Sequence, residues 1–169
     1  MTNDSNADRV QIHYTMAVYC TSVDSGDVDG VVSAFAEDGH LELSSGTKAA
    51  GRTAIRAFYM PVIGTDRPDR SPDGAIPLLR HNLTTSRIDF VGDDTAHGAT
   101  YFLSLTRHGP DHAGRYLDRF VRHGARWLIA DRRIVVEWYA SPSWYEQVRL
   151  KVAAPSVGSK EIRLETRVS

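Results

Sequence analysis

The second half of the chain consists of four extended runs separated only by short turns. The runs cover residues 79–91, 95–106, 114–122 and 126–138. Turn-forming residues fill the gaps, as Gly92-Asp93-Asp94, His108-Gly109-Pro110 and His123-Gly124-Ala125. Consecutive strands joined by tight turns pair in an antiparallel fashion. This half of the chain therefore predicts an antiparallel meander.

The first half of the chain has helical spacing instead. A first helix is expected from residues 6–8 to Gly26, a second over 28–36 with Asp27 as its cap, and a third from 51–53 to Pro61. A short strand is expected at 40–43. Spacings of three and four residues predict one stripe on the first helix, made of Val10, Tyr14, Ala17, Cys20 and Asp24.

Three helices followed by a long antiparallel sheet form an α+β layout. The length of 169 residues fits a single domain, predicted over residues 1–151. Residues 64–77 are rich in Pro, Gly and Asp, which predicts a lid or a disordered loop. Residues 152–169 are polar and have no clear period, which predicts a tail that is disordered or reaches a neighbouring subunit.

The charges of the chain nearly balance, with 20 Lys and Arg against 21 Asp and Glu. This balance gives no reason to expect nucleic acid or an anionic membrane as a partner. The N-terminus is polar, and no run of about 18 apolar residues occurs. Cys20 is the only cysteine, which excludes an internal disulfide. A cytoplasmic location is the resulting expectation.

Seven histidines raise the question of a metal site, but no His-x-His or Cys-x-x-Cys pair occurs. His108 and His112 lie four residues apart, yet the Gly-Pro between them prevents a helix that would align the rings. A solvated turn is favoured at this point. Phosphate-binding glycine loops, nucleophile elbows and dinucleotide fingerprints do not occur. We therefore expect neither a metal nor an organic cofactor.

Asp24 and His81 are the first candidate catalytic residues. Asp24 is in phase with the apolar stripe, where a carboxylate costs free energy unless it finds a partner. His81 opens the strand that follows the Pro-rich segment. A carboxylate beside a histidine fixes its tautomer and stabilises the imidazolium, which makes a general base. The alternative is a half-exposed Asp24 and a structural His81, and the sequence leaves both open.

The last two strands carry a second group of candidates. In the expected strand over 114–122, the two-residue period of a strand places Tyr116, Asp118 and Phe120 on one face. On the next strand Arg132 shares a face with Ile134 and Val136. Asp118 is either an acid on a dry concave surface or the partner of a nearby arginine. Arg132 either neutralises a substrate charge or forms a cross-strand salt bridge.

Several motifs together point to a known family. They are Ser22-Val23-Asp24 at a helix end, Gly51-Arg52-Thr53-Ala54-Ile55, His81 at a strand start, Gly114-Arg-Tyr-Leu-Asp-Arg-Phe and Arg126-Trp-Leu-Ile-Ala-Asp-Arg. Over residues 8–139 the chain resembles the SnoaL-like group of the nuclear transport factor 2-like superfamily. Among its members the likeness is nearest to lindane dehydrochlorinase, scytalone dehydratase and the bile-acid dehydratases. The resemblance implies a cone-shaped α+β barrel, with three N-terminal helices packed on a curved, mainly antiparallel sheet.

The resemblance also implies roles for the candidates. In such enzymes an aspartate at the end of the first helix orients a strand-borne histidine that abstracts a proton, which matches Asp24 and His81. Arg132 resembles a pocket arginine, and Asp118 an acid used by polyketide cyclases and bile-acid dehydratases. The tyrosine that holds the substrate carbonyl has three candidate counterparts, Tyr14, Tyr19 and Tyr59, of which Tyr14 is favoured because it shares the stripe with Asp24. Further lining of the pocket is expected from Tyr116, Phe120, Ile134 and Val136.

The function expected from this resemblance is a lyase or isomerase, foremost a dehydratase, acting on a mostly apolar cyclic small molecule in an enclosed pocket. Elimination of a hydrogen halide, polyketide-type cyclisation and epoxide hydrolysis by an Asp-Arg-Asp set are alternatives. So are a non-catalytic ligand-binding or association module and the small subunit of a ring-hydroxylating dioxygenase. A homodimer or homotrimer is the expected assembly.

Overall fold

Four helices and six strands make up the computed structural model, which describes residues 5–64 and 78–152. In chain order they are α1 (Ser5–Ser25), α2 (Val28–Ser33), β1 (Phe35–Leu43), β2 (Lys48–Ala50), α3 (Gly51–Ile63), β3 (Leu79–Phe90), β4 (Thr95–Thr106), β5 (Gly109–His123), β6 (Arg126–Tyr139) and α4 (Trp144–Val152). The predicted α+β layout is confirmed. The predictions for residues 65–77 and 153–169 lie outside the described ranges.

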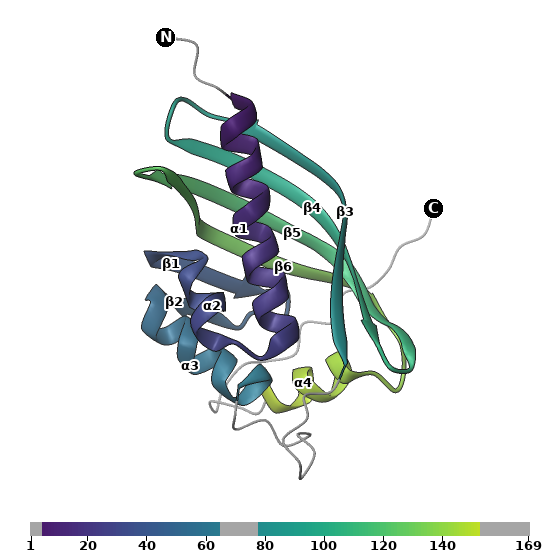
Figure 1. Cartoon of the computed structure of the whole chain (residues 1–169). Coiled ribbons are helices and arrows are strands. Elements are labelled where there is room, and N and C mark those ends of the chain that lie inside the picture. The colour runs from purple at the N-terminus through teal and green to yellow at the C-terminus, as the bar shows by residue number, and fades with distance from the viewer. Residues whose placement is uncertain (1–4, 65–77, 153–169) are drawn as a thin grey trace, which may run out of the picture.

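All six strands form one sheet in the order β2-β1-β6-β5-β4-β3. Strands β3 to β6 pair antiparallel as the predicted meander, and β1 joins β6 in parallel. The sheet is open, with β2 and β3 at its edges. Figure 1 shows that it curves around α1, while α2, α3 and α4 gather near the end of the molecule where α1 finishes. The curved sheet and α1 thereby enclose the interior.

Helix α1 buries a different stripe from the predicted one. Its buried apolar side chains are Ile12, Met16, Tyr19, Cys20 and Val23. Val10 and Tyr14 are instead 65% and 63% exposed. Ala17 is exposed as well. The predicted stripe was therefore wrong at its first three positions, because spacings of three and four residues fit more than one face of a helix and the sheet selects which face is buried.

Pairing and packing also move several element boundaries. Helix α2 ends at Ser33 and not at residue 36, because Phe35 pairs with Ile129 of β6. Helix α3 continues past Pro61 to Ile63, since its last residues Val62 and Ile63 are buried. Strand β5 starts at Gly109, where a turn was expected. Strand β2 and helix α4 were not predicted.

The turn after α1 fixes the position of Asp24. Gly26 has a φ of 75°, a left-handed conformation that glycine adopts at little cost. Asp27 then caps α2, because its carboxylate accepts a hydrogen bond from the backbone N–H of Gly30 at 2.9 Å. The chain thus reverses immediately beyond Asp24. The carboxylate of Asp24 is left at the beginning of β3.

The sheet register decides which strand face looks inward. Asp118 pairs with Arg132 and Tyr116 with Ile134, so these residues share one face, and Tyr116, Asp118 and Arg132 are buried.

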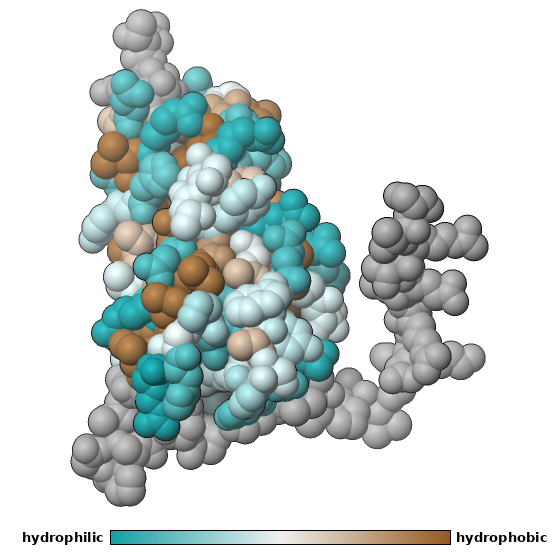
Figure 2. Space-filling model, turned by 90° about the vertical axis from the view of Figure 1, so that its right-hand side faces the viewer, coloured by the Kyte–Doolittle hydropathy of each residue, from teal (hydrophilic) through white to brown (hydrophobic). Residues whose placement is uncertain are grey.

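On the side of the molecule shown in Figure 2, apolar side chains form small groups among polar ones. None of the helices in the described part of the chain is long and apolar enough to cross a membrane.

Candidate active site

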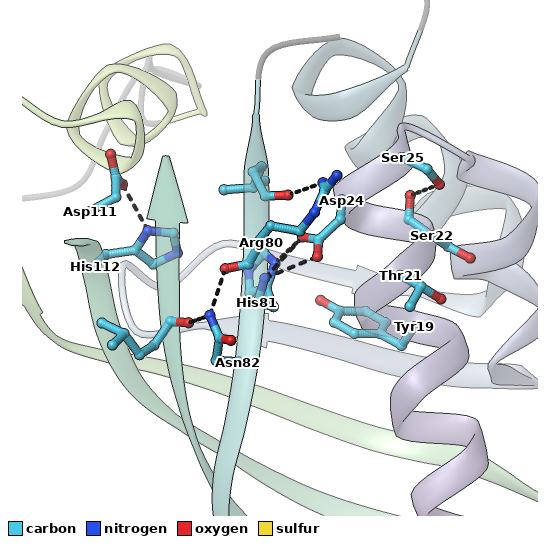
Figure 3. A network of polar contacts seen from close by, with 12 residues as sticks. Tyr19, Thr21, Ser22, Asp24, Ser25, Arg80, His81, Asn82, Asp111 and His112 are labelled. Carbon is cyan, nitrogen blue, oxygen red and sulfur yellow. Dashed lines mark hydrogen bonds and ion pairs between the residues drawn. The ribbon is translucent and has the colours of Figure 1, made fainter. Parts of the chain in front are cut away.

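Asp24 and His81 lie in contact at the end of the molecule where α1 finishes (Figure 3). The distance from His81 Nδ1 to Asp24 Oδ1 is 2.6 Å. The backbone N–H of His81 also donates to the two carboxylate oxygens, at 3.2 and 3.0 Å. Asp24 therefore holds both the main chain and the ring of His81.

This contact sets which nitrogen of His81 is free. A carboxylate only accepts hydrogen bonds, so Nδ1 carries the proton and Nε2 keeps its lone pair. Among the described residues no hydrogen bond reaches Nε2. The two side chains are only 6% and 10% exposed. Such an arrangement can take a proton from a bound molecule at Nε2 while Asp24 stabilises the imidazolium.

A second aspartate–histidine pair lies beside the first. His112 Nδ1 is 2.8 Å from Asp111 Oδ2, and the side chains are 6% and 4% exposed. The rings of His112 and His81 are 5.9 Å apart between centroids and nearly perpendicular. Asp111 also caps α4, because it accepts the backbone N–H groups of Trp144 at 2.7 Å and Tyr145 at 3.2 Å. This pair was not predicted from the sequence.

A β-bulge explains why the pair was missed. Ser104 pairs with His112 and Leu105 with Pro110, so Asp111 has no partner on β4. The extra residue turns Asp111 toward α4 and leaves His112 on the inner face. The solvated turn predicted around His112 is therefore wrong. Continuing the two-residue period of Tyr116 and Asp118 back along the strand would have found His112 on their face.

Burial and charge act on both members of this pair. Burial lowers the pKa of His112, the hydrogen bond to Asp111 acts in the opposite direction, and the charge of His81 lowers it further. Burial alone would raise the pKa of Asp111, but the hydrogen bonds from His112, Trp144 and Tyr145 outweigh burial and lower it. Asp111 thus stays an acceptor, and His112 favours its neutral form.

The lowered pKa of His112 predicts that acid destabilises the fold. A histidine in the unfolded chain titrates near pH 6.5. Below about pH 6.5 the unfolded state takes up a proton that folded His112 does not. The free energy of unfolding therefore decreases as the pH is lowered. In urea titrations at pH 7.5 and 5.5, the wild type should lose more unfolding free energy than His112→Gln. Equal losses would contradict the prediction.

Asp118 and Arg132 form a buried pair across β5 and β6. Arg132 Nε donates to Asp118 Oδ1 at 2.9 Å and Arg132 Nη2 to Oδ2 at 2.7 Å. The guanidinium carbon lies 4.1 Å from the ring centre of Tyr19 and 4.2 Å from that of Tyr116. Nη1 is buried without a hydrogen-bond partner among the described residues. The cross-strand pairing predicted as one alternative is present, and it leaves one donor unused.

Two tyrosines beside this pair share a hydrogen bond through their hydroxyl groups, Tyr19 and Tyr59. Burial raises the pKa of each above its usual value, so both remain protonated at neutral pH. One shared hydrogen bond uses one of the two hydroxyl protons. The second proton is left as a donor.

The two candidate pairs do not touch each other, but aromatic rings connect them. The centroid of His81 is 6.1 Å from that of Phe102, which stacks on Tyr116 at 4.6 Å. Tyr116 in turn contacts Arg132. Phe120, predicted as pocket lining, is fully buried, while Ile134 and Val136 are partly buried against the core. Tyr14 is exposed, so its predicted place beside the substrate is wrong for the described structure.

Cys20 is also buried among these groups. Burial raises the pKa of its thiol to about 12, and the nearby charge of Asp24 acts in the same direction while that of Arg132 opposes it. Thiolate is the reactive form. We expect Cys20 in the native protein to resist iodoacetamide at pH 8 and to react after unfolding in urea. Rapid alkylation of the native protein would contradict this expectation.

No group of three or more His, Cys, Asp or Glu side chains that could hold a metal ion occurs within residues 5–64 and 78–152. The imidazole rings of the two aspartate–histidine pairs lie next to each other. Each carboxylate accepts a hydrogen bond from the Nδ1–H of its own histidine. The arrangement is one for proton transfer and hydrogen bonding.

A family model described as a SnoaL-like domain matches residues 4–133 of the sequence, which is most of the chain. The chain belongs to the SnoaL-like domain family. The resemblance predicted from the motifs is thereby confirmed. No curated protein matches the sequence.

Several solved structures superpose well on this chain. A Mycobacterium tuberculosis protein of unknown function has a TM-score of 0.72, with 22% identity over 89% of each chain. A protein from Novosphingobium aromaticivorans named as a candidate scytalone dehydratase has 0.68, with 20% identity over 83% of this chain and 91% of its own. A hexachlorocyclohexane dehydrochlorinase has 0.65, with 17% identity over 81% and 90%. These similarities concern the fold.

Proposed function

We propose that this SnoaL-like protein is a cofactor-independent lyase, foremost a dehydratase, with His81 as its general base. The observation that carries the proposal is the buried contact of Asp24 with His81 Nδ1, which leaves Nε2 free. Relatives in fold that bear the names dehydratase and dehydrochlorinase support the same reaction class.

The proposed reaction starts at a carbon next to a carbonyl group. His81 Nε2 takes a proton from that carbon, and the electrons of the broken C–H bond form an enolate. The enolate then expels a hydroxyl group from the neighbouring carbon as a C=C bond forms. The hydroxyl leaves with the proton held by His81, so the products are water and an unsaturated ketone. The reaction is redox-neutral and restores the enzyme.

The tyrosine pair is suited to the carbonyl oxygen of such a substrate. Tyr19 and Tyr59 keep one hydroxyl proton that their mutual hydrogen bond does not use. A hydroxyl donor at a developing enolate oxygen stabilises the transition state. Arg132, held by Asp118 and packed on Tyr19, keeps a positive charge next to this donor. In this proposal Asp118 and Arg132 act by positioning the tyrosines.

Epoxide hydrolysis is less well supported by the same geometry. It requires a second carboxylate on the arginine, but both oxygens of Asp118 are taken by Arg132. Within the described residues, Arg132 Nη1 has no partner. The buried arginine thus lacks the second acid of an Asp-Arg-Asp set.

A matched set of probes tests the proposed function. The wild type is incubated with 3-hydroxycyclohexanone, 3-chlorocyclohexanone and cyclohexene oxide, and 2-cyclohexenone is followed by its ultraviolet absorbance. A lyase forms 2-cyclohexenone from one or both ketones above the uncatalysed rate. Formation of labelled diol from cyclohexene oxide in ¹⁸O-water would instead support a hydrolase. Binding of the probes without any turnover would support the ligand-binding module.

A further inference from the structure

We infer that His112 is a substrate-binding residue whose Nε2 accepts a hydrogen bond from a hydroxyl group of the substrate. The site would then select hydroxylated ring compounds over ethers and halides of the same shape. The inference deepens the proposed function, on which it rests only for placing the ligand beside His81.

The protonation pattern of His112 follows from its contacts. Asp111 accepts three hydrogen bonds, from the ring of His112 and from two backbone amides at the start of α4. A carboxylate that is an acceptor in all of these contacts requires the proton of His112 to be on Nδ1. Nε2 of the neutral ring therefore carries a lone pair and can only accept.

The ring of His112 is also held in one orientation. It stacks on Trp144 and Tyr145, with centroid distances of 6.0 and 5.1 Å. It is steeply inclined to the rings of His81 and Phe102, at 81° and 70° with centroid distances of 5.9 and 5.7 Å. Figure 3 shows the rings of His112 and His81 lying between the carboxylates of Asp111 and Asp24. Turning either ring would break its hydrogen bond to the carboxylate.

His81, Ser104 and His112 form one row across three strands. His81 pairs with Ser104, and Ser104 with His112, so all three side chains lie on the inner face. The hydroxyl of Ser104 is fully buried and has no hydrogen-bond partner among the described residues. Hydrogen bonds to Nε2 of the two histidines are likewise absent from the described part of the chain.

The buried hydroxyl of Ser104 costs free energy while it has no partner, and Nε2 of each histidine beside it can accept a hydrogen bond, so this row favours a ligand that can pair with these groups. Nε2 of His112 needs a donor, which a hydroxyl group supplies and an ether or chloride does not. Sites built to bind a hydroxyl discriminate strongly against analogues that lack it, because their own polar atoms are then left unpaired. The rival role for His112 is structural, as a support for Asp111 at the start of α4.

Binding of two unreactive ligands separates these roles. The probes are 2-tetralol and its methyl ether, 2-methoxytetralin, neither of which has a proton next to a carbonyl. We expect the wild type to bind 2-tetralol about 10-fold more tightly, in line with one additional neutral hydrogen bond. His112→Leu should abolish this preference and His112→Gln, whose amide oxygen can accept, should keep part of it.

Ser86→Ala is the matched control. Ser86 lies on the same strand as His81 but outside the row, and its hydroxyl shares a hydrogen bond of 2.8 Å with that of Thr100. It should keep the full preference. A second measurement needs no variant: the ¹⁵N signal of His112 Nε2 should shift on addition of 2-tetralol and not of 2-methoxytetralin. The inference is overturned if the preference survives in His112→Leu, if the wild type shows none, or if neither probe binds. Because the probes cannot react, the binding result stands apart from the turnover test of the proposed function.

Discussion

His81→Gln should lower kcat for the ketone that the wild type turns over by a factor of about 10² to 10⁴. Loss of a positioned general base has an effect of this size. Glutamine removes the basic nitrogen but keeps an N–H that can donate to Asp24. The carboxylate that contacts His81 at 2.6 Å in the wild type is therefore not left unpaired. Steady-state kinetics together with the urea midpoint of each variant measure the effect.

Asp24→Asn should produce a loss of similar size through a different cause. An asparagine amide can donate to Nδ1, which would move the imidazole proton to Nε2 and remove the free lone pair. His97→Ala is the matched control, since His97 is an exposed histidine on β4. His97→Ala should keep wild-type kcat. Wild-type kcat in both His81→Gln and Asp24→Asn would show that the reaction does not use this pair.

Breaking the buried Asp118–Arg132 pair should cost about 3–5 kcal/mol of unfolding free energy. Each single change, Asp118→Leu or Arg132→Met, leaves an uncompensated charge where both side chains are essentially inaccessible to solvent, at 1% and 0% exposure. Burial alone would lower the pKa of Arg132, but the charge and hydrogen bonds of Asp118 raise it, so Arg132 stays charged. Urea unfolding followed by tryptophan fluorescence gives the loss.

The double variant Asp118→Leu/Arg132→Met should recover most of that loss, because it removes both buried charges at once. The neighbouring pair Arg119–Asp131 provides a control on the opposite face of the same two strands. Its side chains are 42% and 44% exposed, so Arg119→Met should cost about 0–1 kcal/mol. A loss from Arg132→Met as small as that from Arg119→Met would contradict the buried-pair prediction.

The alternation of side chains correctly predicts which candidate residues of β5 and β6 share a face. Period two puts Tyr116 and Asp118 on one face, and Arg132 with Ile134 on another, and the register joins these faces. A strand alternates sides at every residue, so the pattern is local and readable from the chain. It does not tell which face is inward, because the neighbouring strand and helix decide that.

Asp111 shows the limit of this approach, whereas His112 follows the alternation of Tyr116 and Asp118. The Gly-Pro before Asp111 is a typical turn signal, but pairing with β4 makes it the beginning of β5. The bulge at Asp111 depends on how two strands align. The capping contact of Asp111 depends on α4, whose residue Trp144 lies 33 positions further along the chain. Signals of this kind are not contained in any short stretch of sequence.

Local periodicity and motifs along the chain were enough to predict the α+β class, the order of the three N-terminal helices, the meander and the family. The contacts of the site come from the tertiary structure alone: Asp24 touches His81 across 57 positions, Asp118 binds Arg132, Tyr14 faces solvent, and a second aspartate–histidine pair stands beside the first. Contacts between distant residues arise from the curvature and register of the whole sheet. Burial then selects which polar groups need each other, since an unpaired charge or hydrogen-bonding group is costly only once it is removed from water.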